Sequence, residues 1–165
     1  MKKTFLVGIV ALAFAANAAL GGTVYSWEND TEGWKLQGGN GAPMDSNFST
    51  ELGVTDGDYS IVVQVPPGWF QFGSPYNNGN QELIQEVIDN QIMRLDVTVP
   101  DTTVYIPEWA GVQVALMLQS DVANTGDVAY TMLTPGETTT VEYDYSDLDF
   151  TGSTWIQWRF ITNLA

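Results

Sequence analysis

The chain has 165 residues, of which 44% are hydrophobic and 12% aromatic, and its 20 acidic against five basic residues give a net charge of −15. It has no Cys and no His, which excludes disulfides, thiolate and imidazole metal sites and Ser-His-Asp triads. The acidity disfavours nucleic acid as a partner, and the apolar content is too high for a disordered chain.

The first 18 residues have the pattern of a secretory signal peptide. A cationic start at Lys2 and Lys3 precedes an apolar run over residues 5–16, and residues 16–18 supply the small side chains that signal peptidase recognises. We expect cleavage after Ala18, export to the periplasm or the exterior, and one domain over residues 19–165 with no membrane span. The alternative is an uncleaved anchor, for which the apolar run is short.

Strand patterns then follow one another along the chain. Ile61, Val63 and Val65 alternate with Ser60 and Gln64, as expected of a strand that is covered on one side. The same alternation predicts strands at 93–99, 112–119 and 155–160. Weaker signals predict further strands at 23–27, 34–37, 128–133 and 138–143.

One helix is predicted over residues 81–90. Leu83, Ile84, Val87 and Ile88 fall on one stripe of this segment, and Glu82 lies in the first turn, where the helix dipole favours a negative charge. Short strands with turns between them and a single short helix predict an all-β fold, an antiparallel β-sandwich.

Three segments resemble the jelly-roll carbohydrate-binding modules and their galactose-binding-like relatives. They are YSWENDTEGW at residues 25–34, GVTDGDYSI at residues 53–61, and the late strand that runs from TWIQW at residues 154–158 to Asn163. The resemblance implies a secreted bacterial jelly-roll domain that binds sugar without catalysis. Such domains usually end with a further strand carrying an Asp-Asn pair, so either the sequence is truncated or the sheet closes differently.

A sugar-binding surface needs exposed aromatic rings beside planar amide or guanidinium groups. Trp155 is in phase with Gln157 and Arg159, on the polar side of its strand, and Arg94 and Gln113 lie on the polar sides of theirs. If these strands share one sheet, the five residues form a ligand face. The alternative is that Arg94 pairs with surface carboxylates and that Trp155 covers one end of the barrel.

Three further rings lie in segments that have the composition of loops. Trp69 follows a Pro-Pro-Gly turn, Tyr76 lies in a stretch rich in Asn and Gly, and Trp109 follows Ile106-Pro107-Glu108. Rings on loops at the rim of a sandwich either contact a ligand or cover the core.

Carboxylates in two turns suggest calcium, which prefers hard oxygen ligands. In the resembling modules the Glu of the first strand helps to hold a structural calcium, and this position corresponds to Glu28. Asp56 and Asp58, which flank Gly57, would supply further oxygens. Asp30 and Glu32 lie in the same turn as Glu28, and for these two the alternative is that they are solvated turn carboxylates.

We expect a secreted, non-catalytic carbohydrate-binding protein whose partner is a polysaccharide. One alternative is a structural or adhesive surface protein. Another is a small glycan-active hydrolase, for which Glu108, Glu142 and Asp144 are the candidate carboxylates.

Overall fold

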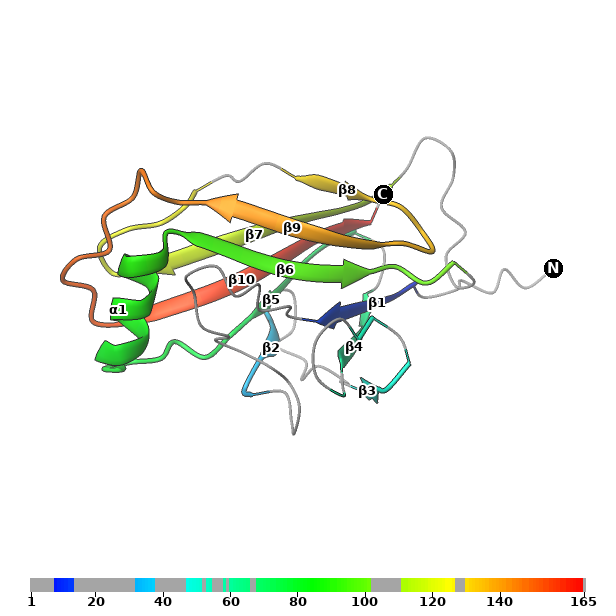
Figure 1. The fold of residues 1–165 in the computed structure, drawn as a ribbon, viewed down its shortest axis with the longest axis horizontal. Helices are drawn as coiled ribbons and strands as arrows, with labels where there is room; N and C mark the ends of the chain where they lie inside the picture. Colours follow the sequence, from blue (N-terminus) through cyan, green and yellow to red (C-terminus); the bar gives the residue numbers. More distant parts are fainter. Residues whose placement is uncertain are drawn as a thin grey trace.

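Two antiparallel sheets and one helix make up the part of the chain that the structure, a computed structural model, describes (Figure 1). The described residues are 8–13, 32–37, 47–51, 53–54, 58, 60–65, 68–101, 111–126 and 130–164. The expected mostly-β fold with antiparallel sheets and one short helix is therefore confirmed. The predicted strand at 23–27 lies outside the described residues, as do Glu28, Asp56, Glu108 and Trp109.

The first sheet, called sheet A, has five strands in the order β3-β4-β1-β6-β9. Their bounds are β3 Asn47–Ser49, β4 Ser60–Val65, β1 Gly8–Ala13, β6 Ile92–Thr98 and β9 Thr138–Asp144. In β6 and β9 the alternation in the sequence places Leu95, Val97 and Val141 on the buried side. Strand β9 is an edge strand.

Sheet B, the second sheet, has the order β2-β5-β10-β7-β8. Its strands are β2 Lys35–Gln37, β5 Gly68–Gly73, β10 Ile156–Leu164, β7 Val112–Ser120 and β8 Thr131–Leu133. Strand β10 lies in the centre and is paired with β7 over its whole length. The expectation that Trp69 lies in a loop is wrong, because Trp69 belongs to β5, where Phe72 points into the core.

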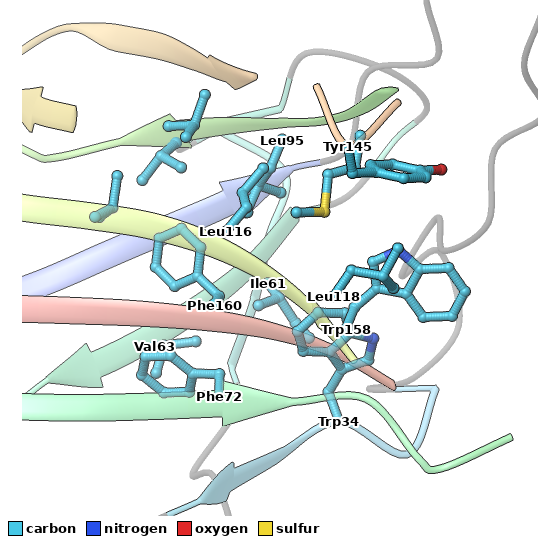
Figure 2. Packing of buried hydrophobic residues seen from close by; sticks show 14 of the residues in the cluster. Trp34, Ile61, Val63, Phe72, Leu95, Leu116, Leu118, Tyr145, Trp158 and Phe160 are labelled. Atoms are coloured by element: carbon cyan, nitrogen blue, oxygen red, sulfur yellow. The ribbon is translucent and has the colours of Figure 1, made fainter. Parts of the chain in front are cut away.

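The core fills the space between the two sheets, and both sheets contribute to it. Figure 2 shows Ile61 and Leu95 of sheet A together with Leu118 and Trp158 of sheet B. The rings of Phe72 and Phe160 pack at 6.1 Å between centroids. Trp158 is only 7% exposed, so the sequence pattern assigned it to the correct side of its strand.

Helix α1, Gln81–Asn90, lies at one end of the sheets (Figure 1) and has the bounds that the sequence predicts. The side chain of Asn80 accepts a hydrogen bond from the Leu83 amide at 3.1 Å, and the helix ends at Gln91 in the left-handed conformation. Ile84 and Val87 are buried against the core. The helix therefore closes this end of the core.

Strand β1 comes from the segment that the sequence analysis assigns to the signal peptide. Residues Gly8–Ala13 pair with β4 on one side and with β6 on the other, in the middle of sheet A. Cleavage after Ala18 would remove this strand from sheet A and leave every strand of sheet B in place. The cleavage remains a prediction, which N-terminal sequencing of the exported protein tests: a start at Ala19 supports it, and a start at Met1 contradicts it.

Candidate functional site

The outward side of sheet B gathers four of the eight side chains expected to bind ligand. Since neighbouring residues of a strand point to opposite sides, the side chains that alternate with the core-facing Leu116 and Phe160 point away from the core. We call this surface the amide face. Its side chains are those of Lys35, Trp69, Gln71, Gln113, Ala115, Met117, Gln119, Met132, Gln157, Arg159, Ile161 and Asn163.

A hydrogen-bond network centred on Gln157 orders the middle of the amide face. Its Oε1 accepts hydrogen bonds from Gln119 Nε2 at 2.9 Å and from Arg159 Nε at 3.0 Å. Its Nε2 donates to the Ser74 carbonyl at 2.8 Å. Arg159 Nη1 donates in turn to Gln71 Oε1 at 3.1 Å. Gln157 is fully buried, so it positions Gln119 and Arg159 and is not itself open to a ligand.

The same face has an amide pair and an apolar patch farther along β10. Asn163 Nδ2 donates to Gln113 Oε1 at 3.3 Å, across the β10–β7 pairing. Ala115 and Ile161 are buried between this pair and the Gln157 network, with Met117 packed against them. The accessible part of the face therefore consists of the exposed Lys35, Trp69 and Met132 together with half-buried amide side chains, a combination that offers both apolar contacts and hydrogen bonds to a ligand.

Exposed aromatic rings lie at one end of the amide face. Trp69 is opposite Asn163 in the sheet register and is 52% exposed, and Tyr130 is 42% exposed. Trp69 Nε1 donates a hydrogen bond to the Tyr130 hydroxyl at 3.0 Å, which holds the two rings together. Met132, 56% exposed, lies across from Gln113 at the same end.

A second aromatic pair lies at the opposite end of sheet B. Trp155 directly precedes β10, and Tyr76 follows β5 closely; their rings meet edge to face at 5.2 Å between centroids. The Tyr76 carbonyl accepts a hydrogen bond from the Ile156 amide at 3.0 Å. Trp155 is half-buried, whereas Tyr76 is exposed. Eight residues of extended chain, about 26 Å, separate Trp155 from Asn163.

The structure unites most, but not all, of the residues expected to bind ligand. The following are brought to sheet B or its ends: Trp69, Tyr76, Gln113, Trp155, Gln157 and Arg159. Arg94 is on sheet A instead, where its Nε is 2.5 Å from Glu142 Oε2, so it takes the pairing with a surface carboxylate that the sequence analysis gave as the alternative. Trp109 lies outside the described residues.

Several side chains of the amide face are not among the residues predicted to bind ligand, including Lys35, Gln71 and Asn163, and neither is Tyr130, which contacts the face through Trp69. The phase of β5 could have revealed Gln71, because it alternates with the buried Phe72. Asn163 is in phase with Gln157 and Arg159. No local pattern links Tyr130 to Trp69, which is 61 residues away.

The carboxylates considered for catalysis do not have the environment that a general acid needs. Glu142 is paired with Arg94, and Asp144 lies beside it on the edge strand β9. A hydrogen bond from the Ser146 amide lowers the pKa of Asp144, whereas a glycosidase acid needs a raised pKa. Glu108, the third candidate, lies outside the described residues.

A pocket of about 330 Å³ beside α1 is equally unsuited to acid–base catalysis. Its lining includes Tyr145 and Asp149. Burial raises the pKa of Tyr145 to about 12, and its hydroxyl donates to the Val87 carbonyl at 3.0 Å. Hydrogen bonds from the Thr151 side chain and amide lower the pKa of Asp149. Neither group exchanges protons near neutral pH.

The described part of the chain contains no group of three or more Asp, Glu, His or Cys side chains that could hold a metal ion. Glu28 and Asp56, the expected calcium ligands, lie outside it. The calcium site therefore stays a prediction. In the same part of the chain, no helix is long and apolar enough to cross a membrane.

Comparison with known protein families, curated proteins and solved structures finds no match to this chain. The chemistry of the amide face is therefore the basis for assigning a function.

Proposed function

We propose that this protein is a secreted, non-catalytic carbohydrate-binding protein of the jelly-roll type, and that its amide face binds a polysaccharide. The observation that carries this proposal is the combination of the exposed Trp69–Tyr130 pair with amide side chains in register beside it. Aromatic rings stack on the C–H faces of sugars, and amides exchange paired hydrogen bonds with hydroxyl groups.

The ordering of the face supports binding because it lowers the entropy lost when a ligand is bound. Trp69 is held by Tyr130, Gln113 by Asn163, and Arg159 by two glutamines. Side chains already fixed by such contacts lose little further freedom when they contact a sugar. Ligand binding by a preorganised polar surface of this kind requires no catalytic group.

The edge of sheet A argues against the adhesive alternative. A sheet that recruits other proteins through its edge presents a flat, apolar edge strand. Strand β9 instead carries exposed Thr138, Thr140, Glu142 and Asp144. These polar and charged side chains disfavour edge-to-edge pairing.

The test is a binding screen of the exported protein against insoluble and soluble polysaccharides and a glycan array, with affinities measured for every polymer that is bound. Trp69→Ala should weaken binding at least about tenfold, because an exposed ring that stacks on a sugar carries a large share of the binding energy. Ile92→Ala removes an exposed apolar side chain from sheet A and serves as the matched control, which should bind as the wild type does. Absence of binding to every polymer, or equal effects of the two substitutions, would overturn the proposal.

A further inference from the structure

Two cations share one row of the amide face, with a glycine between them. Lys35 of β2 is directly opposite Gly73 of β5, and Gly73 is directly opposite Arg159 of β10. Residues directly opposite one another in a sheet point to the same side. Gly73 has no side chain and is itself buried, so the accessible groups of this row are the exposed Lys35 and the half-buried Arg159.

Arg159 keeps most of its donors available. A guanidinium group has five N–H donors, and in Arg159 one donates to Gln157 and one to Gln71. Both acceptors are neutral amide oxygens. Among the described residues no carboxylate is within ion-pair distance of Arg159 or of Lys35. Three donors of a half-buried cation thus remain for a ligand.

The surroundings of this row differ from the rest of a very acidic chain. The protein has 20 acidic residues, yet the five strands of sheet B contain no Asp or Glu. Arg94, on the outward side of sheet A, is neutralised by Glu142. Partial burial of a cation without a counter-charge is costly, and the cost is recovered when an anion binds.

We infer that the amide face selects a polysaccharide whose sugar units carry a carboxylate, and that the carboxylate binds to the free N–H donors of Arg159 on the side that Lys35 shares. This inference rests on the proposed function and specifies its ligand class. The fixed fork of a guanidinium matches the two oxygens of a carboxylate, and Nε and Nη1 of Arg159 are already oriented by Gln157 and Gln71. Lys35, which is exposed, adds a second positive charge.

The net charge of −15 repels a polyanion, but this repulsion acts over a longer distance than the ion pair between Arg159 and the ligand carboxylate. At physiological ionic strength it is screened beyond about 8 Å, whereas a direct ion pair at Arg159 is screened much less. Binding is therefore to be measured near physiological salt.

The test compares polymers that differ only in charge. Polygalacturonate and alginate are each paired with their esterified form, in which the carboxylates are neutral. The affinity for each polymer is measured for the wild type and for three variants, Arg159→Gln, Lys35→Gln and Arg94→Gln. We expect the wild type to bind at least one acid form about tenfold or more tightly than its ester. Arg159→Gln should abolish this preference and Lys35→Gln should reduce it, while Arg94→Gln, the matched arginine on sheet A, should leave it unchanged.

The outcomes separate this inference from the proposed function. Binding of neutral polymers, with no preference for either acid form, overturns the inference and leaves the proposed function standing. Tighter binding of a sulfated galactan than of both acid forms also overturns it. The wild-type comparison needs no variant, and Lys35→Gln changes an exposed residue, so both remain decisive if Arg159→Gln fails to fold. No binding to any polymer overturns both proposals.

Discussion

The outward sides of the two sheets differ in charge and in what holds their arginines. On sheet A, Arg94 is paired with Glu142, and Thr140 donates to Asp96, whereas on sheet B the hydrogen bonds of Arg159 to described residues go to the side-chain amides of Gln157 and Gln71. An arginine paired with a carboxylate is already satisfied, while one held by neutral amides retains capacity for a ligand. The same residue type on the same kind of strand thus forms an ion pair on one sheet and, in the proposed function, is available to a ligand on the other.

The sheets also differ in their dependence on the N-terminal segment. Sheet A contains β1, which belongs to the predicted signal peptide, whereas the first strand of sheet B begins at Lys35. Cleavage after Ala18 would change sheet A and leave the amide face with all its strands. If the predicted cleavage takes place, the proposed binding surface therefore lies on the part of the chain that remains.

The largest effect is expected from a pair of substitutions that compares the core side of sheet B with its outer end. Trp158→Ala should lower the free energy of unfolding by about 3–5 kcal/mol, because it empties a large volume in the core. Trp155→Ala should cost less than Trp158→Ala, because Trp155 is partly exposed, although it loses buried area as well as an edge-to-face contact with Tyr76 worth about 1 kcal/mol, and it should weaken glycan binding more than it weakens folding. Urea unfolding measures both changes, and equal destabilisation would show that Trp155 belongs to the core.

The contrast between Trp155 and Trp158 also shows what the sequence could predict. Period-two alternation identified β6, β7, β9 and β10 and the outward side of each, because the phase of a strand is a local property. Pairing between strands is not local, so nothing in the sequence placed Arg94 and Arg159 on different sheets. Nor could the phase of Gln157 show that its neighbours Gln119 and Arg159 bury it completely.

Strand β5 shows a different limit of sequence reasoning. This strand has large rings on both of its sides, at Trp69, Phe70 and Phe72, so it lacks the alternation of apolar and polar residues. Turn residues precede and follow it. That composition favours a loop when the segment is considered alone. Its pairing with β10 and β2 overrides the local preference and brings Trp69 onto the amide face.

Bound calcium would add a stabilising contribution that depends on the concentration of the ion. If Glu28 and Asp56 share an ion, calcium at about 100 times its dissociation constant should stabilise the fold by about 2.7 kcal/mol, because the ion binds only the folded state. Thermal unfolding with calcium and with excess chelator measures this. Glu28→Ala should remove the difference, and identical midpoints for the wild type would eliminate the ion.

A smaller effect is expected at the end of sheet B where Asp121 joins β7 to β10. Hydrogen bonds from the Thr154 side chain and amide lower the pKa of Asp121 below its usual 3.8. A carboxyl group with a lowered folded-state pKa stabilises the fold above its unfolded pKa, and this contribution disappears as the pH falls through the folded value.

Asp121→Asn should therefore lower the free energy of unfolding at pH 7. Between about pH 5 and pH 2, the free energy of unfolding of the variant should fall less steeply than that of the wild type. Asp149→Asn is the control, because Asp149 bonds only to Thr151, two residues away, and joins no strands. Urea unfolding as a function of pH measures both variants. A larger effect at Asp149 than at Asp121 would contradict the assignment.

The most direct test of the amide face is a ¹H–¹⁵N NMR titration of the exported protein with a short oligosaccharide of the polymer that it binds best. We predict shifts of the Trp69 indole N–H and of the side-chain amides of Gln71, Gln113 and Asn163, with little change in the indole signals of the buried Trp34 and Trp158 or in the backbone amides of β9. Shifts concentrated in β6 and β9, with the Trp69 signal unchanged, would place the ligand on sheet A and contradict the account.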